Sequence, residues 1–199
     1  KDPRKEGAKK KLVLTQRARR IFAFALLINA MIIAGAAFPH TPLLWLIPVQ
    51  LIPLTLALAN FALQPFEDAV QQKFWTEAHN KVKELNPAVI GITGSFGKTS
   101  VKHILGHVLQ SAAPTLITPG SVNTPMGVTR IIREQLETRH KYFVVEMGAY
   151  GPGSIKRLCD LTPPDLGVVT AIGHAHYERF KTLETVATAK FEMAEAAIA

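Results

Sequence analysis

The 199-residue sequence is poor in cysteine: it has one, Cys159, so no disulfide can form within the chain. This excludes a disulfide-stapled fold and is typical of a reducing compartment. No residue that could act as its general base is evident near Cys159 in the sequence, and we interpret it as a small core residue rather than a nucleophile. With 48% hydrophobic residues, the chain has ample material for a core.

Acidic residues are too few at the N-terminus to balance the basic ones there. Residues 1–20 hold nine of the 23 basic residues and two of the 15 acidic ones, whereas the remainder has 14 basic and 13 acidic residues. The net charge of +8 therefore belongs almost entirely to this first segment. Because the basic segment directly precedes an apolar run, it indicates a membrane partner rather than a nucleic acid.

Charged residues are absent from two long apolar runs. Residues 21–38 form the first, which is long enough as a helix to cross most of a ~30 Å hydrocarbon layer. Residues 43–63 form the second, and its Pro48 and Pro53 are kinks that a membrane tolerates better than water does. The sequence therefore predicts a transmembrane helical hairpin over residues 21–63.

The turn of this hairpin has no Lys or Arg, whereas residues 1–20 are strongly basic. The positive-inside rule then predicts that residues 1–20 are a cytosolic segment and that both ends of the hairpin face the cytosol. We expect an inner (cytoplasmic) membrane protein with its catalytic domain on the cytosolic side. The alternatives are a cleaved signal peptide, disfavoured because a second apolar run follows at once, and a buried soluble helix pair, disfavoured because polar faces are lacking.

Residues 64–87 mix charges with apolar side chains. Phe66, Val70 and Phe74 recur every four residues, which is the stripe of an amphipathic helix. We predict an amphipathic linker helix that ends at Asn86-Pro87 and lies on the bilayer surface or packs on the following domain.

From residue 88 onward, predicted strands and helices alternate. The expected strands are 88–92, 115–118, 142–148 and 165–172, and the expected helices are 98–109, 128–137, 154–159 and 183–199. Such alternation predicts an α/β fold with a mostly parallel sheet and helices on both faces. In sheets of this kind, ligands bind beyond the carboxyl ends of the strands.

The glycine-rich stretch of residues 91–100 stands between the first of these strands and its helix. Its backbone N–H groups can cradle phosphate oxygens, Lys98 can reach the outer phosphates, and the Thr99 hydroxyl can ligate Mg²⁺. We interpret the stretch as an ATP site of the P-loop type. Its predicted ATP-binding residues are Gly94, Ser95, Phe96, Gly97, Lys98, Thr99 and Ser100.

The standard pattern G-x-x-x-x-G-K-[ST] fails here because its first glycine would fall at Ile92. The shorter form T-G-[ST]-x-G-K-[ST] fits residues 93–99, and with the segments 146–155, 164–173 and 175–180 it resembles the Mur ligase family. The resemblance covers roughly residues 89–196, the first part of that family's central domain. It is strongest to the branch that adds D-alanyl-D-alanine to a UDP-N-acetylmuramoyl tripeptide.

The resemblance implies an ATP-driven ligation in peptidoglycan or other cell-envelope synthesis. A carboxylate of an envelope precursor becomes an acyl phosphate, and an amine such as D-alanyl-D-alanine attacks it. Lys98, Glu146 and His176 are the implied catalytic residues. Cations must lie between a triphosphate and a carboxylate, which repel each other, so Thr99 and Glu146 are expected to share a Mg²⁺. A salt-bridged or helix-capping Glu146 is the alternative.

A second Mg²⁺ is implied near His176 and Lys190. The family lysine that matches Lys190 is carbamylated by CO₂ and becomes a metal ligand, which requires a lowered pKa such as burial provides. A solvated helix lysine is the alternative for Lys190, and a structural role is the alternative for His176. Asn123 matches an asparagine of the family's phosphate-side loop, whereas His174 has no counterpart that we assign.

The N-terminus departs from the family pattern, because Mur ligases ordinarily begin with a soluble domain that binds the uridine nucleotide. A lipid-linked or membrane-proximal acceptor is our hypothesis, with membrane lipid as a partner. We also expect the sequence to be a fragment that lacks the amine-binding domain. Two alternative functions stay open: a ligase of another polymer, such as poly-γ-glutamate, and a membrane-anchored P-loop ATPase that acts as a switch or transport component.

Overall fold

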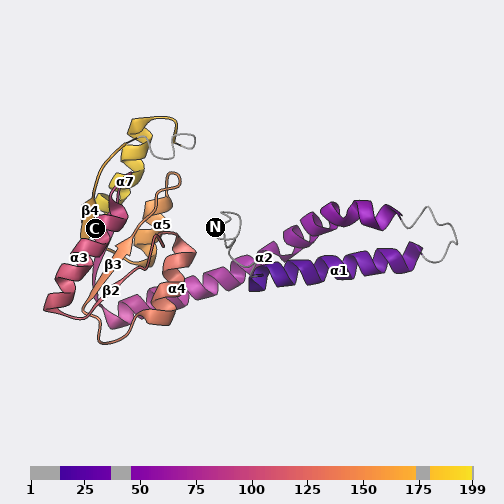
Figure 1. Cartoon of the computed structure of the whole chain (residues 1–199), viewed down its shortest axis with the longest axis horizontal. Coiled ribbons are helices and arrows are strands. Elements are labelled where there is room, and N and C mark those ends of the chain that lie inside the picture. The colour runs from indigo at the N-terminus through magenta and orange to yellow at the C-terminus, as the bar shows by residue number, and fades with distance from the viewer. Residues whose placement is uncertain (1–13, 37–45, 174–179, 199) are drawn as a thin grey trace, which may run out of the picture. The chain divides into compact units, whose positions relative to one another are not determined.

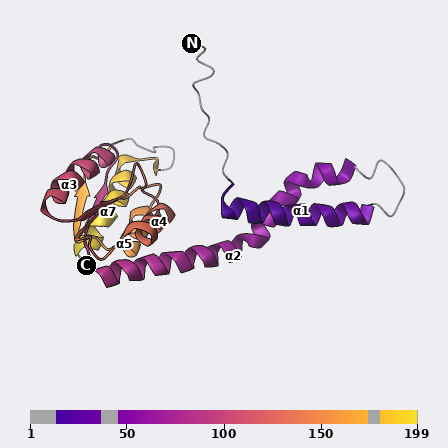
Figure 2. The same cartoon turned by 60° about the horizontal axis from the view of Figure 1, so that its bottom comes forward.

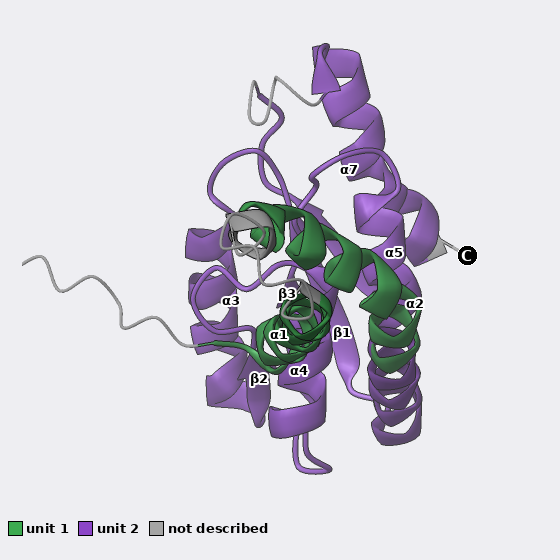
Figure 3. Cartoon of the chain, turned by 90° about the vertical axis from the view of Figure 1, so that its right-hand side faces the viewer, with its two compact units in different colours: residues 1–70 green, residues 71–199 purple. Residues whose placement is uncertain are grey.

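The computed structural model describes residues 14–36, 46–173 and 180–198 (Figure 1). It divides into two compact units, Lys1–Val70 and Gln71–Ala199, coloured separately in Figure 3. The boundary falls inside a helix. Each unit is described by itself.

In the first unit, α1 (Gln16–Ala36) pairs antiparallel with the first part of α2 (Leu46–Leu85). The hydroxyl of Thr15 accepts a 3.2 Å hydrogen bond from the backbone N–H of Ala18, which caps the start of α1. Polar contacts join the two helices along their length: Asn29 Nδ2 donates to Thr55 Oγ1 over 2.7 Å, and Arg20 pairs with Glu67 at 2.6 Å. In the described residues, the segment predicted as a transmembrane hairpin is thus a pair of antiparallel helices.

One helix in the described part of the chain is long and apolar enough to cross a membrane, by length and composition, over Gln16–Gly35. The second predicted span begins within residues 37–45, which lie outside the described residues. Its described part contains Gln50, Thr55 and Asn60 and does not meet the same test. Two separate elements were expected over 43–63 and 64–87, but α2 runs unbroken through both, with Pro53 and Pro65 inside it.

In the second unit, four parallel strands form a sheet in the order β2-β3-β1-β4. The strands are β1 (Ala88–Thr93), β2 (Thr115–Ile117), β3 (Tyr142–Glu146) and β4 (Leu166–Val169). The helices are α3 (Lys98–Ala112), α4 (Pro125–Gln135), α5 (Ser154–Leu161) and α7 (Leu183–Ile198). The predicted α/β fold with a parallel sheet is confirmed.

Helices cover both faces of the sheet, as expected (Figure 2). Ile90, Ile92 and Val144 are buried against α3 on one face. The larger core lies on the other face, where Val89 and Phe143 pack with side chains of α4, α5 and α7 and of the end of α2. Alternate residues of each strand point to opposite faces, which explains why β1 and β3 are apolar almost throughout.

Several element boundaries differ from the sequence-based expectation by one to three residues, and local contacts explain two of these differences. Helix α4 begins at Pro125 rather than at residue 128, because the Thr124 hydroxyl caps it by accepting from Gly127 N at 3.3 Å. Strand β4 ends at Val169 rather than at residue 172. Thr170 N still donates to Thr93 O at the end of β1, but Ala171 and Gly173 then bond to Ser95 of the glycine-rich loop instead of to a strand.

Candidate active site

The glycine-rich loop connects the central strand β1 to α3. Gly94 and Gly97 have φ values of 147° and 80°, which side chains rarely tolerate. A Cβ at Gly94 would also lie 1.9 Å from the Thr170 hydroxyl. Glycine is therefore required at Gly94 both for backbone conformation and for space, and the loop is held close to the end of β4.

The segment after β4 holds this loop through several hydrogen bonds. The Thr170 hydroxyl lies 2.6 Å from the carbonyl of Phe96 and 3.1 Å from that of Thr93. Ser95 donates its backbone N–H to Ala171 O at 2.7 Å, and its hydroxyl lies 2.8 Å from Gly173 O. Of the predicted loop residues, Ser95 is thus buried in these contacts, whereas Phe96 and Ser100 are exposed. Sequence reasoning missed Thr170, which no local pattern marks.

Lys98 begins α3 and folds back over the loop. Its ammonium donates to Gly94 O at 2.7 Å and to Ser95 O at 3.4 Å. Gly97, the residue before the helix, makes no side-chain cap, so the first N–H groups of α3 are left for another acceptor. A lysine and a helix N-terminus at one loop form a site suited to an anion such as a phosphate.

Glu146 ends β3 beside this loop and is 1% exposed. The Thr99 hydroxyl donates to its Oε2 at 2.9 Å, and Asn123 Nδ2 donates to its Oε1 at 3.1 Å. The structure therefore brings together three predicted residues that are distant in sequence. Because β1 and β3 are parallel neighbours with Ile92 opposite Glu146, both strands end at the same edge.

A third side chain bonds to this carboxylate, that of Lys102, and it was not predicted. Its ammonium forms an ion pair with Glu146 Oε2 at 3.0 Å and also donates to the carbonyl of Gly120. Lys102 is fully buried. The signal available in the sequence was its position one turn after Lys98 and Thr99, which puts it on the same helix face. The salt-bridged alternative for Glu146 is thus realised together with its contact to Thr99.

Asn123 is held in place from several sides. Its carbonyl accepts from Gly148 N at 2.9 Å, and its Oδ1 accepts from the hydroxyl of Tyr150 at 2.7 Å. The Tyr150 bond orients the side-chain amide so that its NH₂ group faces Glu146. The Glu146 carboxylate and the Thr99 hydroxyl are hard oxygen ligands of the kind that Mg²⁺ prefers, so these two side chains fit the predicted cation.

Lys190, on α7, is 3% exposed and forms no ion pair within the described part of the chain. Burial lowers its pKa to about 8, and the nearby charge of Lys98 also lowers it. The alternative that Lys190 is a solvated helix lysine is therefore wrong.

His176 and His174 lie outside the described residues. Within the described residues, no group of three or more His, Cys, Asp and Glu side chains could hold a metal ion.

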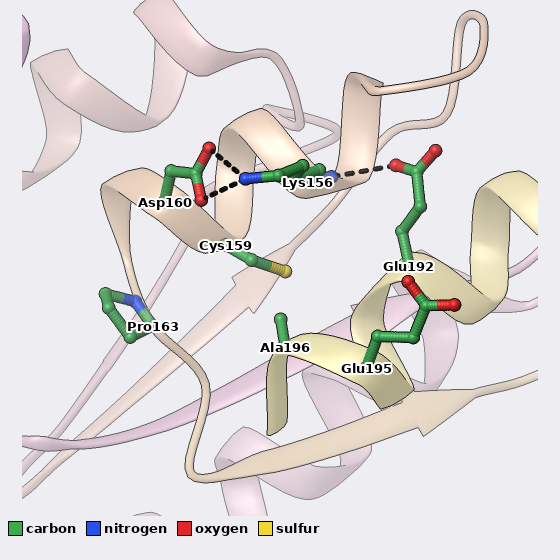
Figure 4. Close-up of a pocket in the computed structure, with 7 residues that line it drawn as sticks. All are labelled: Lys156, Cys159, Asp160, Pro163, Glu192, Glu195 and Ala196. Atoms are coloured by element: carbon green, nitrogen blue, oxygen red, sulfur yellow. Dashed lines mark hydrogen bonds and ion pairs between the residues drawn. The ribbon is translucent and has the colours of Figure 1, made fainter. Parts of the chain in front are cut away.

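A separate cavity of about 540 Å³ lies beside α5 and α7 (Figure 4). It is lined by Lys156, Cys159, Asp160, Pro163, Glu192, Glu195 and Ala196. Glu192 accepts from the backbone N–H groups of Gly153 and Lys156 at 2.6 and 2.8 Å, and so caps α5. Burial raises the pKa of Cys159 to about 12, which keeps it a thiol and agrees with a core role. The cavity shares no residue with the glycine-rich loop.

The parallel sheet, the glycine-rich loop at its central strand and the adjacent carboxylate define a P-loop type of α/β nucleotide-binding domain. The model of the Mur ligase middle domain matches residues 92–197, more than half of the chain. The chain therefore belongs to the Mur ligase family, as its motifs predicted.

Relatives of the chain within this family include D-alanyl-D-alanine ligases. The chain is 36% identical over 119 residues to the UDP-N-acetylmuramoyl-tripeptide--D-alanyl-D-alanine ligase of Buchnera aphidicola, covering 60% of this chain and 25% of that protein. It is 38% identical over 113 residues to the ligase of the same name from Escherichia coli, covering 56% and 25%. The chain thus spans about a quarter of the length of these relatives.

Solved structures agree with the sequence comparison. The MurF ligase of Thermotoga maritima in complex with ADP superposes with a TM-score of 0.61 at 34% identity, covering 64% of this chain and 30% of that one. A crystal structure of MurF from Acinetobacter baumannii has a TM-score of 0.61 at 32% identity, covering 63% and 28%. The fold of the second unit is therefore that of the Mur ligase central domain.

Proposed function

We propose that the chain contributes the ATP-binding part of an ATP-dependent carboxylate-amine ligase of peptidoglycan precursor synthesis. The observation that carries this is the convergence of Lys98, Thr99 and Glu146 at one edge of a parallel sheet, in a chain of the Mur ligase family. The D-alanyl-D-alanine ligases among its relatives suggest that dipeptide as the amine and a UDP-N-acetylmuramoyl tripeptide as the acyl substrate.

In this reaction a carboxylate oxygen of the acyl substrate forms a bond to the γ-phosphorus of ATP, and the bond from that phosphorus to the leaving ADP oxygen breaks. The amine nitrogen then attacks the acyl carbon, phosphate leaves, and the amine gives up a proton. The N–H groups at the start of α3 and the Lys98 ammonium hold the phosphates and offset their negative charge. Lys98 can do so because its present partners are neutral carbonyl groups.

Mg²⁺, when bound, would neutralise charge on the transferring phosphoryl group. Thr99 and Glu146 would hold it, with Asn123 keeping the carboxylate oriented.

Lys190 suits the carbamate that the family resemblance implies, because its depressed pKa leaves a larger fraction of neutral amine to attack CO₂. That addition forms an N–C bond and releases one proton. Isotopically labelled bicarbonate, followed by carbon NMR, tests this, and Lys190→Ala must remove the carbamate signal.

We further propose that the first unit anchors this enzyme to the cytosolic face of a membrane, close to a membrane-proximal or lipid-linked acceptor. Support comes from the length and composition of α1, which is mostly exposed, and from the basic residues before it. The hydrogen bond from Asn29 Nδ2 to Thr55 Oγ1 pairs a donor with an acceptor inside the helix pair, as is common between helices in lipid, whereas Asn29 Oδ1 is buried without a hydrogen-bond partner among the described residues. Washing membranes with alkaline carbonate tests the anchor: release of the protein into the supernatant would contradict it.

The ligase itself is tested by phosphate release from the complete protein in detergent, with ATP, Mg²⁺ and a UDP-linked or lipid-linked acceptor. We expect release that requires both the acceptor and D-alanyl-D-alanine and that Lys98→Ala abolishes. Lys81→Ala is the matched control, because Lys81 contacts Arg133 O on the surface of the second unit. Release that depends on Lys98 but is indifferent to any amine would instead indicate an ATP-driven switch or transport component.

A further inference from the structure

Lys102 is among the largest fully buried side chains of the described residues, at 0% exposure. A buried ammonium group is costly unless ionic and hydrogen-bonded partners surround it. Here those partners are the Glu146 carboxylate, at 3.0 Å, and the backbone carbonyl of Gly120. The proposed ligation chemistry gives this lysine no task, so its position needs a separate account.

The geometry of Glu146 supplies that account. Its Oε2 accepts from Thr99 and Lys102, which both belong to α3, and its Oε1 accepts from Asn123 in the loop before α4. Donors from two different elements thus act on the two oxygens of one carboxylate. With both oxygens engaged, rotation of the carboxylate about its terminal bond would break hydrogen bonds in a buried site.

Lys102 also reaches beyond the carboxylate. Gly120, whose carbonyl it contacts, lies three residues before Asn123 in the loop that follows β2. A single ammonium group therefore ties the end of β3 to the start of the loop that supplies Asn123. An ion pair that served folding alone could often be replaced by apolar residues of similar volume with little loss, whereas loss of Lys102 would also release the loop that supplies Asn123.

We propose that Lys102 is a positioning residue, which holds the Glu146 carboxylate and the loop from Gly120 to Asn123 in the arrangement that receives a divalent cation together with a nucleotide. The inference rests on the proposed function, because it requires a Mg²⁺-nucleotide at this site. Lys102 does not touch the nucleotide in this account. It acts through Glu146, and its ammonium provides the counter-charge that lets the carboxylate stay buried when no cation is bound.

The test is the dependence of ADP affinity on Mg²⁺, measured by calorimetry with the full chain in Mg²⁺ and in chelator. The quantity compared is the dissociation constant of ADP in chelator divided by that in Mg²⁺. A general loss of nucleotide affinity raises both constants and cancels in this ratio. We expect Lys102→Met to reduce this ratio by about 10- to 100-fold, as loss of a group supporting a metal ligand does, while ADP binding in chelator changes little. Lys81→Met, at the surface, is the matched control and should leave the ratio unchanged.

Lys102→Arg is a second test variant. It keeps the positive charge but cannot place one donor between Glu146 Oε2 and Gly120 O. We expect a smaller reduction of the ratio than in Lys102→Met. An unchanged ratio in Lys102→Met overturns the proposal, as does an unchanged ratio in folded Lys102→Arg where Lys102→Met fails to fold. A wild-type ratio near one is a different result, since it contradicts the Mg²⁺ site of the proposed function itself.

Discussion

The ammonium group of Lys98 donates a 2.7 Å hydrogen bond to the carbonyl of Gly94, four residues before it and at the other end of the glycine-rich loop. Its two hydrogen-bond acceptors among the described residues are the backbone carbonyls of Gly94 and Ser95, whereas Lys102 on the same helix face is bound to a carboxylate. A charged phosphate oxygen is a stronger acceptor than a carbonyl. The two lysines therefore differ in function: Lys98 can exchange its partners for phosphate, and Lys102 is held in place.

Lys98→Ala should reduce ATP-dependent ligation by about 100-fold or more, because it removes a fixed charge aimed at the transferring phosphoryl group. The free energy of unfolding should change little, since Lys98 is only half-buried and bonded to neutral groups. Product formation and a thermal melt on the same preparation measure the two effects. Activity within a few-fold of wild type would contradict the role of Lys98 in the site.

Glu146→Gln should lower the free energy of unfolding by about 3–5 kcal/mol, because it leaves the buried Lys102 ammonium without a counter-charge. Lys102→Met combined with Glu146→Gln removes both charges and should recover much of that loss. Chemical denaturation of the single and double variants measures the coupling between the two residues. Strictly additive effects would mean that the pair is not coupled in the native state.

Thr170→Val should weaken ADP binding by about fivefold to tenfold, equivalent to roughly one hydrogen bond, because the Thr170 hydroxyl holds the carbonyls of Phe96 and Thr93. Binding titrations with ADP check this. Thr162→Val is the control: Thr162 is buried and bonds to Leu158 O on α5, away from the loop. Equal losses of affinity in both variants would assign the effect to general destabilisation.

The stability of the chain should carry a pH dependence from Lys190. Its pKa is lowered to about 8 in the folded chain, against 10.5 for an ordinary lysine, so the unfolded state binds more protons between these values. The contribution to the free energy of unfolding therefore rises with pH from about 8 to 10.5, by at most about 1.4 kcal/mol per pH unit. Below pH 8 both states are protonated and this slope disappears.

Denaturation of wild type and Lys190→Met across this pH range, without Mg²⁺ and with CO₂ excluded, isolates the effect. The wild-type curve should rise relative to that of the variant. Parallel curves would show that Lys190 titrates normally in the folded chain.

Much of the second unit could be predicted from local sequence. Strand β1 and the turn at Gly94 and Gly97 follow from an apolar run and residues that tolerate positive φ. Helix α3 follows from the lysine and hydroxyls after that turn and from its apolar periodicity. The start of α4 was placed too late because the capping hydroxyl of Thr124 and Pro125 at the first helical position were not recognised as a helix start.

The continuity of α2 was also missed. Pro53 and Pro65 argue locally for breaks, yet the helix continues through both. A proline has no backbone N–H, so the helix loses one hydrogen bond there. Contacts along the rest of a long helix can offset this loss of stability. Such contacts include the pairing of Glu67 with Arg20 and of Thr55 with Asn29, both long-range in sequence.

The sequence by itself determined the strand-to-helix order of the second unit, the glycine-rich loop with Lys98 and Thr99, and the family, because these depend on contiguous patterns. Only the tertiary structure decided which side chains share the Glu146 carboxylate and how the loop is held. Lys102, Asn123 and Thr170 come from three different segments and reach the site because parallel strands end at one edge of the sheet. Contacts across that edge depend on strand order and register, which no local pattern encodes.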